Sequence, residues 1–347
     1  MSMLTLACSN LSVWITFLLV AIPIRSHATF IELLCGCLLS PEGWVTRAIS
    51  AIRRGGHWTT YYKMLERGNV HVIPLARALF KLVLSVTLTE FPEIITLVID
   101  DTLILRISEN APAAIIRYDH AKKKNQTQFV LAQCWVTLGI SLLGLGVLPI
   151  LSGLVPDKGN RNKLMIAKAL VRAVLGDVLL SKDPSLTIRI LLDSWYMRGP
   201  LLLPWLQRGI RVIGQVRHDT ALFLLPKPIE GKRRGRPRIY GERLLDAAID
   251  ALQTIETVLF LYGKEQRVRL RSIVVLARFL KGTPVLAVWC EFFNEKTQTW
   301  SKPRLLLATE ITLTAIEVVM LYARRWGIET LFFNLKRWWG VNNLWQQ

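Results

Sequence analysis

Two mostly apolar runs that each end in aspartate constrain the fold of this chain more than any other feature. Ile94 to Ile99 runs into Asp100 and Asp101, and Thr187 to Leu192 runs into Asp193. Short apolar runs of this kind predict strands buried on both sides by helices. We therefore expect two buried strands that deliver their carboxylates to the same edge of a sheet.

The segments around these runs predict further strands and helices. The uncharged stretch from Phe129 to Val155 contains several glycines and a proline among β-branched residues, which favours two strands joined by a turn. Asn160 to Leu180 and Arg198 to Arg208 have helical spacing, and Arg211 to Val216 resembles another strand. This order predicts a mixed α/β sheet with helices on its faces.

The remaining segments divide the chain into four parts. Residues 1–90 are predicted to be a helical N-terminal domain that either binds DNA or forms a helical cap with a solvated basic face, and residues 91–216 the first part of an α/β core. Residues 217–308 are predicted to be a β-rich insertion, because four strand-like segments follow one another there. Residues 309–347 complete the core with one long helix from Ile316 to Trp339.

The charge of the chain favours a nucleic-acid partner. It has 44 Lys and Arg against 25 Asp and Glu, a formal net charge of +19. Cations spread along most of a chain suit a phosphate backbone, because each contact releases a condensed counterion. The alternative is a basic surface that only keeps the protein in solution.

Apolar composition raises a second alternative, an integral membrane protein. Hydrophobic residues make up 52% of the chain, and no charged residue precedes Arg25. The first stretch and the stretch from Phe129 to Val155 are both long enough to span a bilayer. We favour a buried helix that ends near Pro23 for the first, and buried strands for the second.

The five cysteines carry little functional information. Their number is odd and no C-x-x-C pair occurs, so neither a disulfide framework nor a zinc knuckle is indicated. We expect small buried side chains in a reducing compartment.

Asp100, Asp193 and a third acid, Glu329, are the candidate metal ligands. Carboxylates gathered at one edge of a sheet repel each other unless a cation lies between them, and Mg²⁺ prefers such hard oxygen ligands. Two ions roughly 3.5–4 Å apart can activate water and stabilise the leaving oxygen in phosphodiester cleavage. A lone aspartate at a strand end more often caps a turn, so the combination carries the prediction.

Four polar residues of the C-terminal helix share one face. Arg325, Glu329 and Lys336 follow Tyr322 at offsets of 3, 7 and 14 residues, which places all four within about 60° on a helix. This face suits a DNA end, with Glu329 on metal, Arg325 and Lys336 on phosphates, and Tyr322 on a phosphate or sugar. The alternative is a surface helix with an ordinary i,i+4 ion pair.

The sequence YARRWGIETLFFNLK, with the pattern Tyr-x2-Arg-x3-Glu-x6-Lys, resembles the signature of one large subgroup of DDE transposases from bacterial insertion sequences. VIDDT resembles the first-acid motif of this subgroup and LLDSWYMRG the second. The gap from Asp193 to Glu329 is also similar to that of the family. The resemblance covers roughly residues 90–347.

The resemblance implies a ribonuclease H-like fold in which a β-rich insertion separates the second acid from the third. It implies metal ligation by Asp100, Asp193 and Glu329. Asp101 is the alternative first ligand, and Asp100 is preferred because it leaves the D-x-T spacing to Thr102. Neighbours in a strand point to opposite faces, so only one of the two aspartates should reach the metal.

The activity implied by the resemblance is cut-and-paste transposition, with DNA strand cleavage followed by strand transfer. Its cofactor would be Mg²⁺, two ions, with Mn²⁺ able to substitute. Its partners would be double-stranded DNA, as terminal inverted repeats and target, and a second copy of the chain in a homodimeric synaptic complex. No small-molecule substrate and no membrane are implied, and the enzyme would act in the bacterial cytoplasm.

Three further features bear on contact with DNA. Arg234 and Arg236 lie in KRRGRPR, which resembles an AT-hook that enters a narrow minor groove. In the resembled family an aromatic residue of the insertion can stack on a flipped base. For Trp289 we favour a core position, and Trp300 is an equally plausible candidate for stacking.

The chain stops soon after Glu329, whereas family members usually continue into further helices. This end predicts a truncated gene product with a complete set of acids. The alternative function is therefore a catalytically inactive remnant that only binds DNA.

Overall fold

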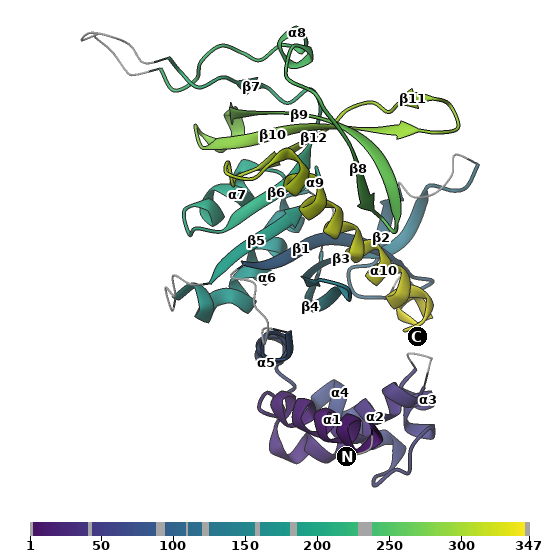
Figure 1. Cartoon of the computed structure of the whole chain (residues 1–347). Helices are drawn as coiled ribbons and strands as arrows, with labels where there is room; N and C mark the ends of the chain where they lie inside the picture. Colours follow the sequence, from purple (N-terminus) through teal and green to yellow (C-terminus); the bar gives the residue numbers. More distant parts are fainter. Residues whose placement is uncertain are drawn as a thin grey trace.

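A single mixed sheet of twelve strands forms the centre of the computed structural model, and helices cover it (Figure 1). The structure describes residues 3–40, 44–87, 94–108, 110–119, 125–156, 160–180, 186–227 and 238–343. The predicted α/β class, a ribonuclease H-like mixed sheet flanked by helices, is confirmed.

The helices are α1 (Met3–Leu19), α2 (His27–Leu39), α3 (Val45–Ser50), α4 (Trp58–Arg67), α5 (Val72–Thr87), α6 (Asn160–Leu180), α7 (Gly199–Leu206), α8 (Asp246–Asp250), α9 (Ala315–Ala323) and α10 (Gly327–Arg337). Short 3₁₀ turns are η1 (Ile24–Ser26), η3 (Arg278–Leu280), η4 (Arg324–Trp326) and η5 (Val341–Asn343). The strands are β1 (Ile94–Leu105), β2 (Ile115–Tyr118), β3 (Phe129–Leu142), β4 (Gly146–Leu154), β5 (Thr187–Leu192), β6 (Arg211–Val216), β7 (Leu222–Phe223), β8 (Ile255–Leu261), β9 (Lys264–Ala277), β10 (Pro284–Asn294), β11 (Thr299–Trp300) and β12 (Arg304–Ala308).

The order of the strands places the two aspartate-bearing strands side by side. β1 pairs with β5 in parallel and with β3 antiparallel, and β5 continues in parallel to β6. β12 then pairs antiparallel with β6, and β10 and β9 follow it in the same sheet. The β-rich insertion is therefore joined to the core by continuous backbone pairing.

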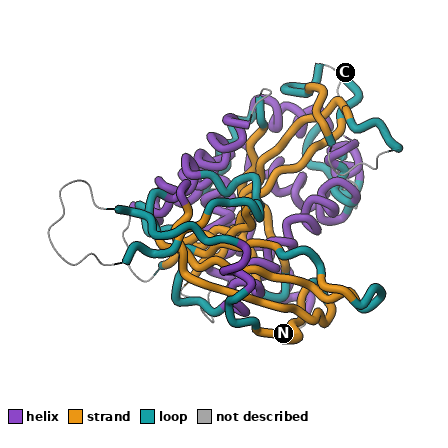
Figure 2. The backbone as a smooth tube through the Cα atoms, turned by 90° about the horizontal axis from the view of Figure 1, so that it is seen from above, coloured by secondary structure: helices purple, strands orange, loops and turns teal. Residues whose placement is uncertain are grey.

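Alternation along β1 and β5 divides the core into two layers. Ile99 and Leu192 lie in the cluster that includes residues of α5, α6 and α7. Val98 and Leu191 lie in the cluster formed with α9 and α10 on the opposite side. Because successive strand side chains point to opposite faces, each strand is buried on both. Figure 2 shows the strands with helices on both sides.

Helices α2, α3 and α4 have a small core of their own around Tyr61, whose hydroxyl donates a hydrogen bond to Glu32. The predicted helix before Pro23 is present as α1, but the expectation that it is buried is wrong. Its apolar side chains are largely exposed, including Val13 and Trp14, because α1 packs mainly against α5.

The search for membrane spans bears on the membrane alternative. Within the described ranges, no helix by itself combines the length and the apolar composition needed to cross a bilayer. Only α4 and α5 taken together reach both criteria, and they are bent by 98° relative to each other. The stretch from Phe129 to Val155 forms β3 and β4, as predicted.

The C-terminal segment differs from the single long helix that was expected. It consists of α9 and α10, joined by the 3₁₀ turn η4. A capping box at Thr314 and Glu317 starts α9, which satisfies backbone N–H groups at the helix start. The path of α10 then crosses the sheet over β1 and β4 (Figure 1).

Candidate active site

The backbone register brings Asp100 and Asp193 together. Ile99 of β1 is opposite Leu192 of β5 in the parallel ladder, so the two aspartates occupy the next position. Asp193 directly follows its strand, as predicted. Asp100 lies within β1 rather than at its end, because pairing with β3 continues the strand to Leu105.

The two neighbouring aspartates of β1 point to opposite faces of the sheet. Asp100 faces the layer of α10, where its Oδ2 is 2.6 Å from Nη1 of Arg325. Asp101 faces α6, where its Oδ2 accepts a hydrogen bond of 2.7 Å from Nζ of Lys163. Only Asp100 is therefore on the face of the helix that carries Glu329.

Arg325 lies between the first and third acids. The same Nη1 atom that contacts Asp100 is 3.7 Å from Oε1 of Glu329. The side chain of Asp100 is 11% exposed and that of Glu329 is 44% exposed. The Arg325 guanidinium thus contacts one buried carboxylate, that of Asp100, and one that is open to solvent, that of Glu329.

Burial and mutual repulsion disfavour the charged forms of the aspartates. Burial, followed by the negative charge of Asp193, raises the pKa of Asp100 to about 7, although Arg325 opposes the shift. Burial also raises the pKa of Asp193 above its usual value. Two neighbouring carboxylates with raised pKa values are stabilised by any additional cation that reaches them.

The donor chemistry of these residues fits a hard divalent cation. Asp100, Asp193 and Glu329 would supply carboxylate oxygens from a strand, a strand end and a helix, the ligand type that Mg²⁺ prefers. Among the described residues, no three His, Cys, Asp or Glu side chains are already grouped closely enough to hold a metal ion. Arg325 instead contacts both Asp100 and Glu329.

A buried network on the α6 side connects β1 with the loop that follows β5. Oδ1 of Asp193 accepts hydrogen bonds from the backbone N–H groups of Trp195 and Tyr196, at 3.0 and 3.1 Å. The Tyr196 hydroxyl donates a 3.0 Å hydrogen bond to Asp101. Neither Tyr196 nor Lys163 was singled out from the sequence, although they lie beside a predicted strand end and in a predicted helix.

The 3₁₀ turn η4, which carries Arg325 and which we call the signature turn, leads into α10. Two close contacts hold this turn and the start of α10 against β3 and β4. Arg324 donates hydrogen bonds to the side chain and the backbone oxygen of Ser141. A Cβ atom at Gly327 would lie 2.9 Å from the Val147 side chain, so the close approach of α10 to β4 depends on glycine. Arg324, next to the signature arginine, was not singled out from the sequence.

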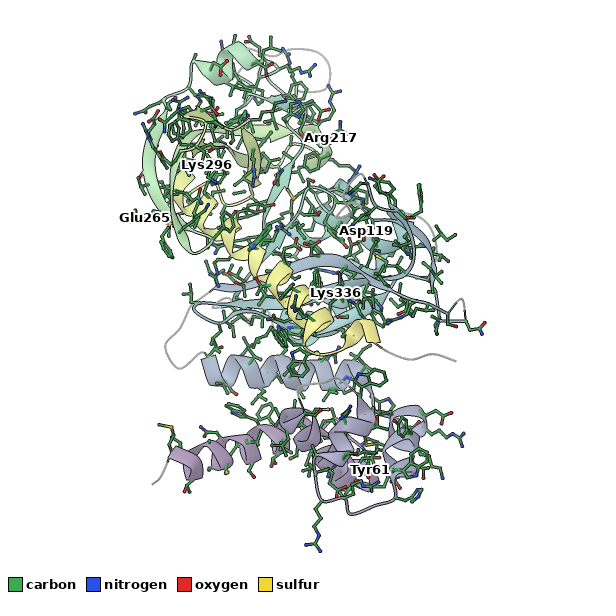
Figure 3. All side chains as sticks on the ribbon, turned by 90° about the vertical axis from the view of Figure 1, so that its right-hand side faces the viewer. Tyr61, Asp119, Arg217, Glu265, Lys296 and Lys336 are labelled. Carbon is green, nitrogen blue, oxygen red and sulfur yellow. The ribbon has the colours of Figure 1, made fainter. Side chains whose placement is uncertain are left out.

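The remaining signature residues, Tyr322 and Lys336, lie on α9 and α10. Burial raises the pKa of Tyr322 to about 12 despite Arg325, whose Cζ is 5.9 Å from the ring centre. Burial lowers the pKa of Lys336, and the charges of Asp119 and Glu329 oppose this shift. Figure 3 shows Lys336 on α10 beside the sheet.

The other candidates have different outcomes. Trp289 is 5% exposed within the main core cluster, so its interpretation as a core residue is confirmed. Trp300 of β11 lies beneath Arg269, whose Cζ is 4.2 Å from the ring centre. Arg234 and Arg236 lie outside the described residues.

A mixed sheet flanked by helices, with acids meeting beside the end of one strand, is the arrangement of a ribonuclease H-like nuclease. A family model described as DDE superfamily endonuclease matches residues 25–273, which is more than half of the chain. The chain therefore belongs to this family, whose members normally use divalent metal ions. The match includes Asp100 and Asp193 and ends before Glu329. No curated protein matches the chain.

Proposed function

We propose that this DDE endonuclease is the transposase of a bacterial insertion sequence, which cuts and rejoins DNA at the ends of its element. The observation that supports it most is the contact of Arg325 with both Asp100 and Glu329, because it joins the signature turn to the first acid. The N-terminal helices and the net charge of +19 suit a DNA substrate. A second copy of the chain would complete the synaptic complex in the cytoplasm.

In the proposed reaction, Asp100, Asp193 and Glu329 would hold Mg²⁺, or Mn²⁺ in its place, and these ions would neutralise charge and activate water for attack. The Arg325 guanidinium would leave the carboxylates and contact a phosphate oxygen near the cleaved bond, and Lys336 would contact a neighbouring phosphate. Water attacks the phosphorus at the element's end, the P–O3′ bond breaks, and the strand is left with a 3′-hydroxyl. This hydroxyl then attacks a phosphodiester of the target strand in the same site, and the target's own 3′-oxygen is the leaving group.

No covalent intermediate on the protein is needed. Tyr322 is the nearest phenol to the acids on the signature face, and burial raises its pKa to about 12. Its hydroxyl therefore stays protonated at neutral pH and serves as a hydrogen-bond donor to a phosphate or sugar.

The test is cleavage of a plasmid that carries the DNA flanking this gene, including its inverted repeats. We expect the full chain to nick this DNA with Mg²⁺, and we expect Asp193→Asn and Glu329→Gln to abolish nicking. Glu265→Gln is the matched control, because Glu265 is an exposed carboxylate on the insertion (Figure 3).

Three other outcomes would contradict parts of this proposal. Binding of the repeats by the wild-type chain without nicking would support the remnant that only binds DNA. Nicking that persists in Asp193→Asn would remove Asp193 from the site. Retention of the protein in membranes after a high-salt wash would support the membrane protein.

A further inference from the structure

Two adjoining hollows lie next to Asp193. One has a volume of about 360 Å³ and the other about 350 Å³, and both are lined by Ser194, Val216 and Arg217. Ser194 directly follows Asp193 in the chain, so the shared wall begins at the second acid. Together the hollows form one groove along the ends of β5 and β6, which we call the β5–β6 groove.

The walls of this groove carry cations. Arg198 and Arg217 line the first hollow, and Arg217, His218, Lys302 and Arg304 line the second. No acidic side chain is among the described residues that line either hollow. The nearby carboxylate of Asp219 forms an exposed ion pair with Arg217. In the described part of the chain, neither Lys302 nor Arg304 is in an ion pair with a carboxylate.

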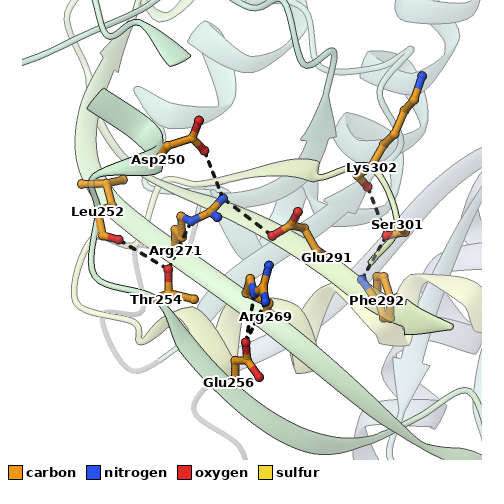
Figure 4. A network of polar contacts seen from close by, with 10 residues as sticks. All are labelled: Asp250, Leu252, Thr254, Glu256, Arg269, Arg271, Glu291, Phe292, Ser301 and Lys302. Carbon is orange, nitrogen blue, oxygen red and sulfur yellow. Dashed lines mark hydrogen bonds and ion pairs between the residues drawn. The ribbon is translucent and has the colours of Figure 1, made fainter. Parts of the chain in front are cut away.

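Two arginines of β9 differ from Lys302 and Arg304 in this respect. Arg269 of β9 pairs with Glu256 of β8, and Arg271 lies 3.6 Å from both Asp250 and Glu291 (Figure 4). The charges of these two arginines are compensated by carboxylates within the protein, whereas the described residues provide no such carboxylate for Lys302 or Arg304.

The far end of the groove approaches the signature face. Tyr262, at the tip of the β8–β9 hairpin, packs edge-on against Trp326, with ring centres 5.9 Å apart. Burial raises the pKa of Tyr262, and the positive charges of Arg304 and Arg325 both oppose this shift. Arg304 of the groove and Arg325 of the site therefore both lie near Tyr262.

Groups that donate hydrogen bonds complete the walls. Ser194 and Thr220 supply hydroxyls, and Gln215 supplies an amide. The first residues of α7, Gly199 and Pro200, line the first hollow, so the positive end of that helix faces it. Cations, hydroxyls and a helix start are the groups that contact phosphates of a nucleic-acid backbone without reading its bases.

We propose that the β5–β6 groove binds the phosphate backbone of a DNA strand that continues from the cleaved bond past Asp193. This inference rests on the proposed function for its substrate. The groove residues would position the strand, and the metal-binding acids would carry out the cleavage. Contacts of this kind supply affinity that falls with salt and does not depend on sequence.

The test measures binding alone, in the presence of EDTA, so that its failure is distinct from a failure to cleave. Fluorescence anisotropy gives the affinity of the full chain for a labelled duplex of the flanking repeat over a range of salt. We expect Lys302→Gln with Arg304→Gln to weaken binding about three- to tenfold and to reduce the slope of log affinity against log salt by about two. Lys296→Gln, an exposed control on the β10–β11 turn (Figure 3), should leave both unchanged.

A second measurement uses the wild-type chain and needs no substitution. Bound duplex should protect Lys302, but not Lys296, from acetylation followed by mass spectrometry. An unchanged salt slope in the double variant, or equal acetylation of Lys302 with and without DNA, overturns the inference. An equal loss of affinity in Lys296→Gln does so too, because it would show a diffuse electrostatic attraction.

Discussion

At the centre of the site, the Arg325 guanidinium contacts Asp100, a carboxylate that is 11% exposed. A buried carboxylate next to a second one is unfavourable, and a single cation from the protein offsets only part of that cost. The pKa of Asp100 is raised to about 7 because part of the cost of holding this buried charge is not compensated. The uncompensated carboxylates therefore lower the stability of the metal-free protein, and binding of further cations to them should raise it.

The first prediction concerns the stability of the metal-free protein. Because the folded pKa of Asp100, about 7, lies above the unfolded value of about 3.9, the fold loses stability progressively as pH rises from about 4 to about 7, and the loss is complete above the folded pKa. Asp100→Asn removes this penalty, so we expect about 1–2 kcal/mol of added stability at pH 8 and no gain at pH 4. Urea unfolding at both pH values measures it. A less stable variant at pH 8 would contradict the prediction.

A second prediction concerns Glu310, a buried acid outside the site. Its two oxygens accept 2.6 Å hydrogen bonds from Arg189, and Arg211 contributes a third at 2.8 Å. Burial disfavours the charge of Glu310, but these arginines outweigh it and hold the pKa below its usual value. The stability from Glu310 is therefore present above the unfolded pKa of about 4.3 and is lost as pH falls through the folded pKa.

Glu310→Gln should destabilise the protein by about 3 kcal/mol at pH 7, because it leaves a buried arginine without its partner. The thermal midpoint measures this. Asp219→Asn, in an exposed pair with Arg217, is the control and should cost less than about 1 kcal/mol. Equal effects of the two variants would show that burial of the Glu310 pair is unimportant.

At the scale of elements, strand β1 and the loop after β5, which carry the first two acids, depend on each other. Tyr196 donates its backbone N–H to Asp193 and its hydroxyl to Asp101, the residue next to Asp100. Lys163 of α6 holds the other oxygen of Asp101. One side chain therefore couples the end of β5 to the middle of β1.

Tyr196→Phe tests this coupling. The change leaves Asp101 without one donor, so we expect a loss of about 1–3 kcal/mol of stability and a higher Mg²⁺ concentration for half-maximal thermal stabilisation. Tyr240→Phe, which removes an exposed hydroxyl bound to a backbone oxygen, should leave the Mg²⁺ response unchanged. A loss of stability with an unaltered Mg²⁺ response would mean that Tyr196 is purely structural.

Periodicity located most elements of this fold, with β5 and α6 found at their observed bounds. It failed where tertiary contacts decide. β1 extends through two charged residues because β3 pairs with it and because Lys163 and Arg325 neutralise them. The contact of Arg325 with Asp100 joins residues that are distant in the chain, and no local pattern indicates it.

The whole molecule contains one large pairing network and one smaller unit. Because β12 pairs with β6, the core and the insertion should unfold together. Helices α2, α3 and α4 have a separate core around Tyr61 and should lose their hydrogen-exchange protection at lower denaturant concentration. Exchange measured by mass spectrometry across a urea series tests this. Simultaneous loss of protection in all segments would contradict it.

The pairing of β6 with β12 also affects how the chain folds during its synthesis. When a ribosome has released β6 at Val216, the partner of Val216 at Leu305 has not been synthesised. At about 5–20 residues per second, the open edge waits for seconds, with the apolar face of β6 available to other nascent chains. Chaperone demand during synthesis should therefore peak in this interval, and messages cut within it should yield aggregates rather than a smaller folded core.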